Sequence, residues 1–105
     1  MFPLDLSDDE FEKAFSEFQQ FGPRRSLPIE KRWREILPEL SSAQISNLLA
    51  LCREIESFAT NVAGDVVYGD LNEQIASKRI LERFPFLSSA QLSRTLSQAC
   101  YFAAK

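Results

Sequence analysis

The residues with the most obvious capacity for chemistry are three consecutive carboxylates, Asp8, Asp9 and Glu10. A pair of carboxyl groups can act as general acid and general base, because one donates a proton while the other accepts one. These three residues fall in the first turn of an expected helix, where the helix dipole favours negative charge. The pattern therefore favours a structural role over catalysis.

Nucleophilic and metal-binding chemistry has still fewer candidate residues. The 105 residues include no His, and Cys52 and Cys100 are the only cysteines, so neither a His-based triad nor a Cys/His metal site can be assembled. The serines gather at expected helix starts, where capping explains them, and three scattered glycines form no phosphate-binding loop. We therefore expect no enzymatic activity, no metal and no cofactor. Both cysteines fall on apolar helical stripes, which favours buried thiols in a reducing compartment.

Basic residues recur at corresponding places in the chain and are the candidate binding residues. Lys31 and Arg32 are matched, 47 positions later, by Lys78 and Arg79. The full candidate set is Arg24, Arg25, Lys31, Arg32, Arg34, Lys78, Arg79 and Arg83. Such a basic stripe would contact an acidic protein or a DNA backbone. The alternative is a solvated helix face with local ion pairs to Glu35 and Glu82.

The single tryptophan, Trp33, lies among these basic residues. Its helical spacing with Ile29, Ile36 and Leu37 predicts a place in the core. If it were exposed, it would be the first candidate for a binding hot spot.

The helices expected to position these residues lie in a stretch of sequence that occurs twice in the chain. "LPELSSAQIS" occupies positions 37–46 and "FPFLSSAQLS" occupies 84–93, and 11 of the 19 positions in 31–49 are identical in 78–96. Self-similarity at a fixed period indicates duplicated supersecondary units. We expect two copies of a helix–corner–helix unit, near 26–60 and 70–105, preceded by an acidic N-terminal helix at 7–21.

Proline and capping signals set the helix boundaries. Pro38 and Pro85 end the first helix of each unit, because proline disfavours the helical conformation of the residue before it. Three Ser-x-x-Glu/Gln pairs fit the capping box: Ser7 with Glu10, Ser41 with Gln44, and Ser88 with Gln91. Asp70 with Glu73 is a similar pair. The predicted helices are 7–21, 27–37, 41–60, 71–84 and 88–104, with the segment "NVAGDVVYGD" as a loop.

These boundaries and the composition predict an all-α protein with five helices. Residues 1–105 are expected to form a single compact domain. The formal charge of −3 and the pI near 4.9 argue against nonspecific binding to nucleic acid. No apolar run has the length of a membrane span or the form of a signal peptide, so we expect a soluble, cytoplasmic protein.

The stretch "ILERFPFLSSAQLSRTLSQAC", residues 80–100, carries a pattern of Ile-Leu-Glu, an aromatic residue, Pro, any residue, Leu and Ser before an apolar helix. The positions that fit are Ile80, Leu81, Glu82, Phe84, Pro85, Leu87, Ser88, Leu92, Leu96 and Ala99. This stretch, with its sibling at 33–52, resembles small bacterial antitoxin-like helix-turn-helix domains of unknown function. The family has a glycine turn before Ile-Leu-Glu, where this chain has "LNEQIASK". The resemblance implies a small bacterial regulator that pairs with a toxin or with DNA.

The sequence is therefore compatible with two hypotheses about the function. The first is a noncatalytic bacterial protein-interaction module, such as an adaptor, inhibitor, immunity protein or antitoxin, that docks a partner protein or a second copy of itself through helical faces. The alternative is a helix-turn-helix transcriptional regulator whose helix 41–58 or 88–104 enters the major groove of DNA. The acidic charge balance favours the first.

Overall fold

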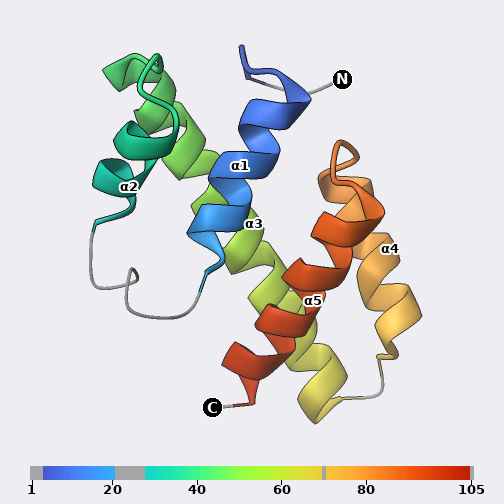
Figure 1. The fold of residues 1–105 in the computed structure, drawn as a ribbon. Coiled ribbons are helices and arrows are strands. Elements are labelled where there is room, and N and C mark those ends of the chain that lie inside the picture. The colour runs from blue at the N-terminus through green and yellow to red at the C-terminus, as the bar shows by residue number, and fades with distance from the viewer. Residues whose placement is uncertain (1–3, 21–27, 70, 105) are drawn as a thin grey trace. The chain divides into compact units, whose positions relative to one another are not determined.

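The computed structural model describes residues 4–20, 28–69 and 71–104, and these residues form five α-helices. The helices are α1 (Asp8–Phe18), α2 (Ile29–Ile36), α3 (Ser42–Tyr68), α4 (Glu73–Arg83) and α5 (Ser89–Ala103). Figure 1 shows them in chain order. The prediction of an all-α protein with five helices is confirmed.

The chain divides into two compact units between Cys52 and Arg53, in the middle of α3. The N-terminal unit comprises the described residues up to position 52, with α1, α2 and the first part of α3. The C-terminal unit comprises those from position 53 on, with the rest of α3, α4 and α5. Each unit buries apolar side chains of its own, such as Phe15 and Leu48 in the first and Ile55 and Ile80 in the second.

The corner between α2 and α3 and the corner between α4 and α5 have closely similar backbone geometry. Leu37 ends α2 at φ −134° and ψ 65°, and Phe84 ends α4 at φ −129° and ψ 73°. Their amides donate to the carbonyl oxygens of Trp33 and Ile80 at 2.7 and 2.8 Å. A proline follows each of these residues, so each helix ends where the sequence predicts it to end.

The second helix of each corner begins with the predicted capping box. Ser41 and Ser88 each donate their backbone N–H to the Oε1 atom of the glutamine three residues on, at 2.8 Å. The glutamine amides donate back to the serine Oγ atoms at 3.1 Å. The same reciprocal bonds join Ser7 and Glu10 at the start of α1, at 2.9 and 3.1 Å. All three predicted boxes are confirmed.

The start of α4 differs from its prediction. The helix begins at Glu73, and Asn72 is its N-cap, with Oδ1 accepting the Ile75 amide at 2.9 Å. The predicted box of Asp70 with Glu73 is therefore not the cap, and Asp70 itself lies outside the described residues. Asn72 has the extended backbone of an N-cap, and its short amide side chain reaches the third helical amide.

The segment predicted to be a loop is helical almost throughout, because α3 continues to Tyr68 instead of ending near position 60. Val62 and Ala63 are buried and extend the apolar stripe of Ile55 and Ala59 by a further turn. This burial outweighs the strand propensity of the valines and the cost of about 1 kcal/mol for a helical glycine such as Gly64.

None of the described helices, including the 27 residues of α3, combines the length and apolarity needed to cross a membrane.

Trp33 forms the centre of the N-terminal unit. Its side chain is fully buried, and its indole Nε1–H donates to the carbonyl oxygen of Ala14 in α1 at 2.9 Å. Its ring centroid lies 6.5 Å from that of Phe18, and the rings of Phe11 and Phe15 stack at 5.1 Å in the same helix. The prediction that Trp33 belongs to the core is confirmed, so it is not an exposed hot spot.

Candidate interaction surfaces

Arg32 was expected on the basic stripe, but the structure places it in the interior of the N-terminal unit. Only 5% of Arg32 is exposed, and its Nη1 atom lies 3.5 Å from Glu17 Oε1 and donates to the Glu17 carbonyl oxygen at 3.2 Å. Glu17 is likewise buried. Arg32 therefore joins α1 and α2, and its guanidinium lies in the interior of the unit and not on an exposed basic stripe.

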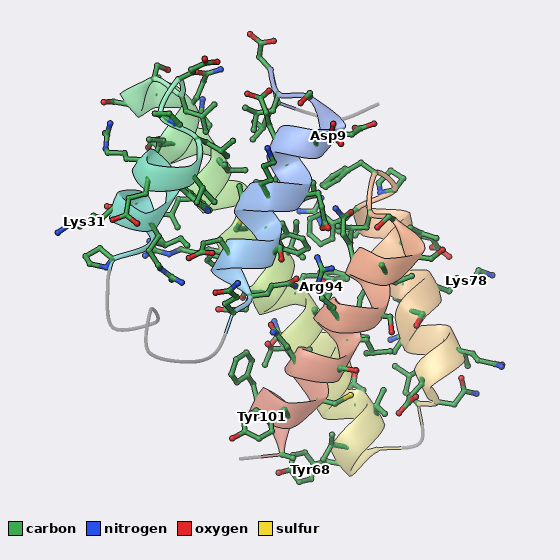
Figure 2. All side chains as sticks on the ribbon, in the orientation of Figure 1. Asp9, Lys31, Tyr68, Lys78, Arg94 and Tyr101 are labelled. Atoms are coloured by element: carbon green, nitrogen blue, oxygen red, sulfur yellow. The ribbon has the colours of Figure 1, made fainter. Side chains whose placement is uncertain are left out.

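The basic side chain at the equivalent position, Arg79, is exposed, as are Lys31 and Lys78. Figure 2 shows Lys31 and Lys78 extending away from the ribbon of α2 and α4, respectively. Arg24 and Arg25 lie outside the described residues. Lys31, Lys78 and Arg79 thus keep their charged ends available to a partner, although Lys31 belongs to one unit and the other two to the other.

Arg34 and Arg83 have partners within their own units. Arg34 Nη2 donates to the Ser42 hydroxyl at 3.3 Å. Arg83 pairs with Glu54 of α3, and its guanidinium carbon lies 5.4 Å from the centre of the Phe84 ring. The pair with Glu54 joins two helices of the C-terminal unit, whereas the sequence suggested a local pair with Glu82. Exposed pairs of this kind stabilise a fold by at most about 1 kcal/mol.

The side chains considered for catalysis occupy structural positions. Ser7, Ser41 and Ser88 cap helices, and Asp8 and Asp9 are exposed in the first turn of α1. In the part of the chain that the structure describes, no group of three or more His, Cys, Asp or Glu residues is placed to hold a metal ion.

The C-terminal unit exposes large apolar side chains that the sequence interpretation missed. Tyr68 is 74% exposed and Tyr101 is 56% exposed, and Val67, Ile75 and Leu81 are also exposed. Figure 2 shows Tyr68 and Tyr101 toward the end of the unit where α3 and α5 finish. The sequence predicts a loop around Tyr68, and an exposed tyrosine in a loop is not unusual. A correct prediction of the end of α3 would have placed Tyr68 in the last turn of a helix, where its exposure marks it as a candidate binding residue.

A groove of about 540 Å³ lies between α4 and α5. Four serines and two leucines are among the residues that line it: Glu73, Gln74, Ser77, Ser89, Leu92, Ser93, Leu96, Ser97 and Cys100. The two helices run antiparallel (Figure 1), so the first turn of α4 and the last turn of α5 share one end of this groove. Glu73 and Cys100 therefore meet there.

The Cys100 thiol has a pKa above its ordinary value, chiefly because burial disfavours the thiolate and also because the Glu73 carboxylate repels it. A higher pKa means a smaller thiolate fraction at any given pH. Since the thiolate is the nucleophile, Cys100 is a poorly reactive cysteine despite its partial exposure.

Alkylation kinetics test this electrostatic effect. In mildly alkaline buffer, iodoacetamide should modify Cys100 more slowly in the folded chain than in urea, and Glu73→Gln should raise the rate in the folded chain by removing the repulsion. Mass spectrometry of the modified peptide gives the rate. Asp9→Asn makes the same change in net charge on another helix and should leave the rate unchanged. A Glu73→Gln rate equal to that of the parent would contradict the assigned cause.

Comparison with protein-family models, with curated proteins and with solved structures finds no match for this chain.

Proposed function

We propose that this chain is a small noncatalytic protein-interaction module of the adaptor, inhibitor, immunity-protein or antitoxin kind, which docks a partner protein through helical faces. The exposure of Tyr68 and Tyr101 at the end of one unit carries the proposal. Tyrosine is enriched in binding hot spots, and among the described residues these two are the most exposed of the large apolar side chains. The resemblance of residues 80–100 to antitoxin-like domains supports a bacterial, cytoplasmic setting.

The proposal includes the origin of the chain as a duplicated helix–corner–helix unit. The two corners repeat the same cap conformations and the same hydrogen bonds at a period of 47 residues, which supports the duplication. The copies have diverged in what they bury. Arg32 is inside its unit, whereas the equivalent Arg79 is outside. At this position, therefore, the second copy presents a cationic side chain at its surface and the first copy does not.

The helix-turn-helix alternative gains little from the structure. The first turns of α3 and α5 present Ser42, Ala43, Ser89 and Ala90 at the surface, and neither turn carries a Lys or Arg. A recognition helix contacts base edges with long polar or basic side chains near its start. Together with the charge of −3, this favours a protein partner over DNA.

Affinity purification from the native cell tests the proposed function. The tagged full chain should enrich a protein partner, and Tyr68→Ser combined with Tyr101→Ser should reduce its recovery at least about tenfold, because truncated hot-spot aromatics cost about 2 kcal/mol or more each. Quantitative mass spectrometry measures the recovery. Both side chains are largely exposed, so circular dichroism of this variant should match that of the parent.

Lys31→Glu combined with Lys78→Glu is the companion variant, because it reverses the charge of the basic candidates without touching either tyrosine. Loss of the partner only in this variant would move the interface to the basic side chains. Enrichment profiles unchanged in both double variants would contradict docking through these faces. Size-exclusion chromatography with light scattering identifies a second copy of the chain as the partner.

A further inference from the structure

The N-terminal unit contains a counterpart of the α4–α5 groove. A groove of about 340 Å³ lies between α2 and the first turns of α3. Most of its lining recurs 47 residues later in the larger groove, in the pairs Glu30 and Ser77, Ser42 and Ser89, Ile45 and Leu92, Ser46 and Ser93, and Leu49 and Leu96. The repeated corner thus produces the same kind of groove twice.

The two grooves differ in the type of residue at one equivalent position. In the smaller groove Arg34 extends from α2 to the Ser42 hydroxyl of α3, so a polar contact connects the two helices over the groove. The equivalent residue of α4 is Leu81, which is 39% exposed and can form no such bond with Ser89. The α4–α5 groove therefore lacks this connection between its two helices.

The floor and walls of the α4–α5 groove suit a helix. Leu92 and Leu96 supply an aliphatic floor. Ser89, Ser93 and Ser97 follow one another at every fourth residue of α5, so they lie along one face. Side chains as small as serine let a neighbouring backbone approach closely, and amphipathic helices bind in apolar grooves by placing their own apolar face on the floor.

Charge selects what kind of helix fits. Among the residues that line this groove, Glu73 is the one formal charge, and it is negative. The same end holds the last turn of α5, which has no basic residue to offset the negative end of its dipole. Burial is the main cause of the raised pKa of Cys100, and the Glu73 carboxylate at this end of the groove raises it further. A cationic side chain would complement it.

We propose that the α4–α5 groove is the docking site for an amphipathic helix of the partner protein, with its apolar face on Leu92 and Leu96 and a Lys or Arg beside Glu73. The proposal rests on the proposed function and adds the site and the chemistry of the partner. Because the groove is small, a single isolated helix should bind with a Kd of about 10–100 µM.

Two synthetic helices test the proposal by NMR titration of the isotopically labelled full chain. The first, peptide K, has about 16 residues with a leucine stripe on one face, lysines along the edges of that stripe, and alanines elsewhere. The second, peptide E, replaces each lysine with glutamate. Peptide K should shift the amide signals of Ser77, Ser93, Ser97 and Cys100 saturably, and peptide E should bind at least about tenfold more weakly. Shifts centred on other residues, equal binding of the two peptides, or a Kd for peptide K above about 1 mM would overturn the proposal.

Two matched pairs of variants separate groove binding from general attraction to an acidic protein. Ser93→Phe fills the groove and should weaken peptide K at least about tenfold, whereas Ser46→Phe places the same ring in the sibling groove and should not. Glu73→Gln should reduce the preference for peptide K over peptide E, whereas Asp9→Asn makes the same change in net charge and should leave it unchanged. Equal effects within either pair would overturn the assignment.

Leu81→Arg gives the larger groove the residue that its sibling has at this position and should also weaken peptide K. Amide spectra of each variant without peptide establish that the fold is retained.

Concentration-dependent shifts of the same groove amides without peptide would assign the groove to a second copy of the chain and overturn the proposal. If Ser93→Phe leaves peptide binding intact while the tyrosine variant still loses its cellular partner, this inference fails and the proposed function stands.

Discussion

Trp33→Ala should lower the free energy of unfolding by about 3–5 kcal/mol, a large fraction of the roughly 5–15 kcal/mol that a domain commonly has. Trp33 is fully buried and donates its indole N–H to Ala14, so the substitution opens a cavity between α1 and α2 and removes their hydrogen bond. Urea unfolding followed by far-ultraviolet circular dichroism measures the loss.

Trp33→Phe is the matched control, because it keeps an aromatic ring and removes the N–H donor and part of the volume. A smaller loss of about 1–3 kcal/mol is expected. Since the chain has one tryptophan, the fluorescence of the parent protein reports on this site alone and should shift to longer wavelength as the N-terminal unit unfolds. A loss below about 1 kcal/mol for Trp33→Ala would contradict its place in the core.

Arg32→Met should destabilise the protein by about 3–5 kcal/mol, because it leaves the Glu17 carboxylate buried without its cation. The ion pair is not an efficient one. Its 3.5 Å separation exceeds the roughly 2.7–2.9 Å of a charge-assisted hydrogen bond, and Arg32 Nε has no acceptor among the described residues. The direct contact between these two side chains therefore recovers only part of the cost of burying the Arg32 guanidinium.

The double variant Glu17→Leu with Arg32→Met should accordingly regain most of the loss and match or exceed the parent in stability. Arg79→Met, at the exposed position equivalent to Arg32, should change the free energy of unfolding by less than about 0.5 kcal/mol. Denaturant unfolding of the parent, both single variants and the double variant forms a cycle that isolates the interaction between Glu17 and Arg32. A double variant as unstable as Arg32→Met alone would show that something other than the loss of the Arg32 cation beside Glu17 causes the destabilisation.

The features that the sequence predicted well depend on residues close together in the chain. Ser41 and Gln44 cap their helix whatever the rest of the molecule does, since both bonds close within three residues. Pro38 likewise acts on its direct neighbour. The corners and most helix boundaries were therefore within reach of sequence reasoning.

The features that were missed depend on packing between distant segments. The extension of α3 required knowing that Val62 and Ala63 are buried, and strand propensity pointed the other way. Arg32 and Arg79 occupy equivalent positions in the repeat, yet Arg32 is buried against α1 of its own unit and Arg79 is exposed, so no property of the local sequence separates a core arginine from a surface one. The α4–α5 groove was also missed, because its two sides come from different helices.

The three capping boxes also bear on how fast the chain folds. Each box closes a loop of three residues, which costs little chain entropy, so a helix start can form before any distant contact exists. Helices grow in well under a microsecond once started, and proteins dominated by local contacts fold in microseconds to milliseconds. The described residues form no strand, so this part of the chain exposes no strand edge on which intermediates could aggregate. The serines that shape the corners thereby shorten the time during which the apolar faces are uncovered.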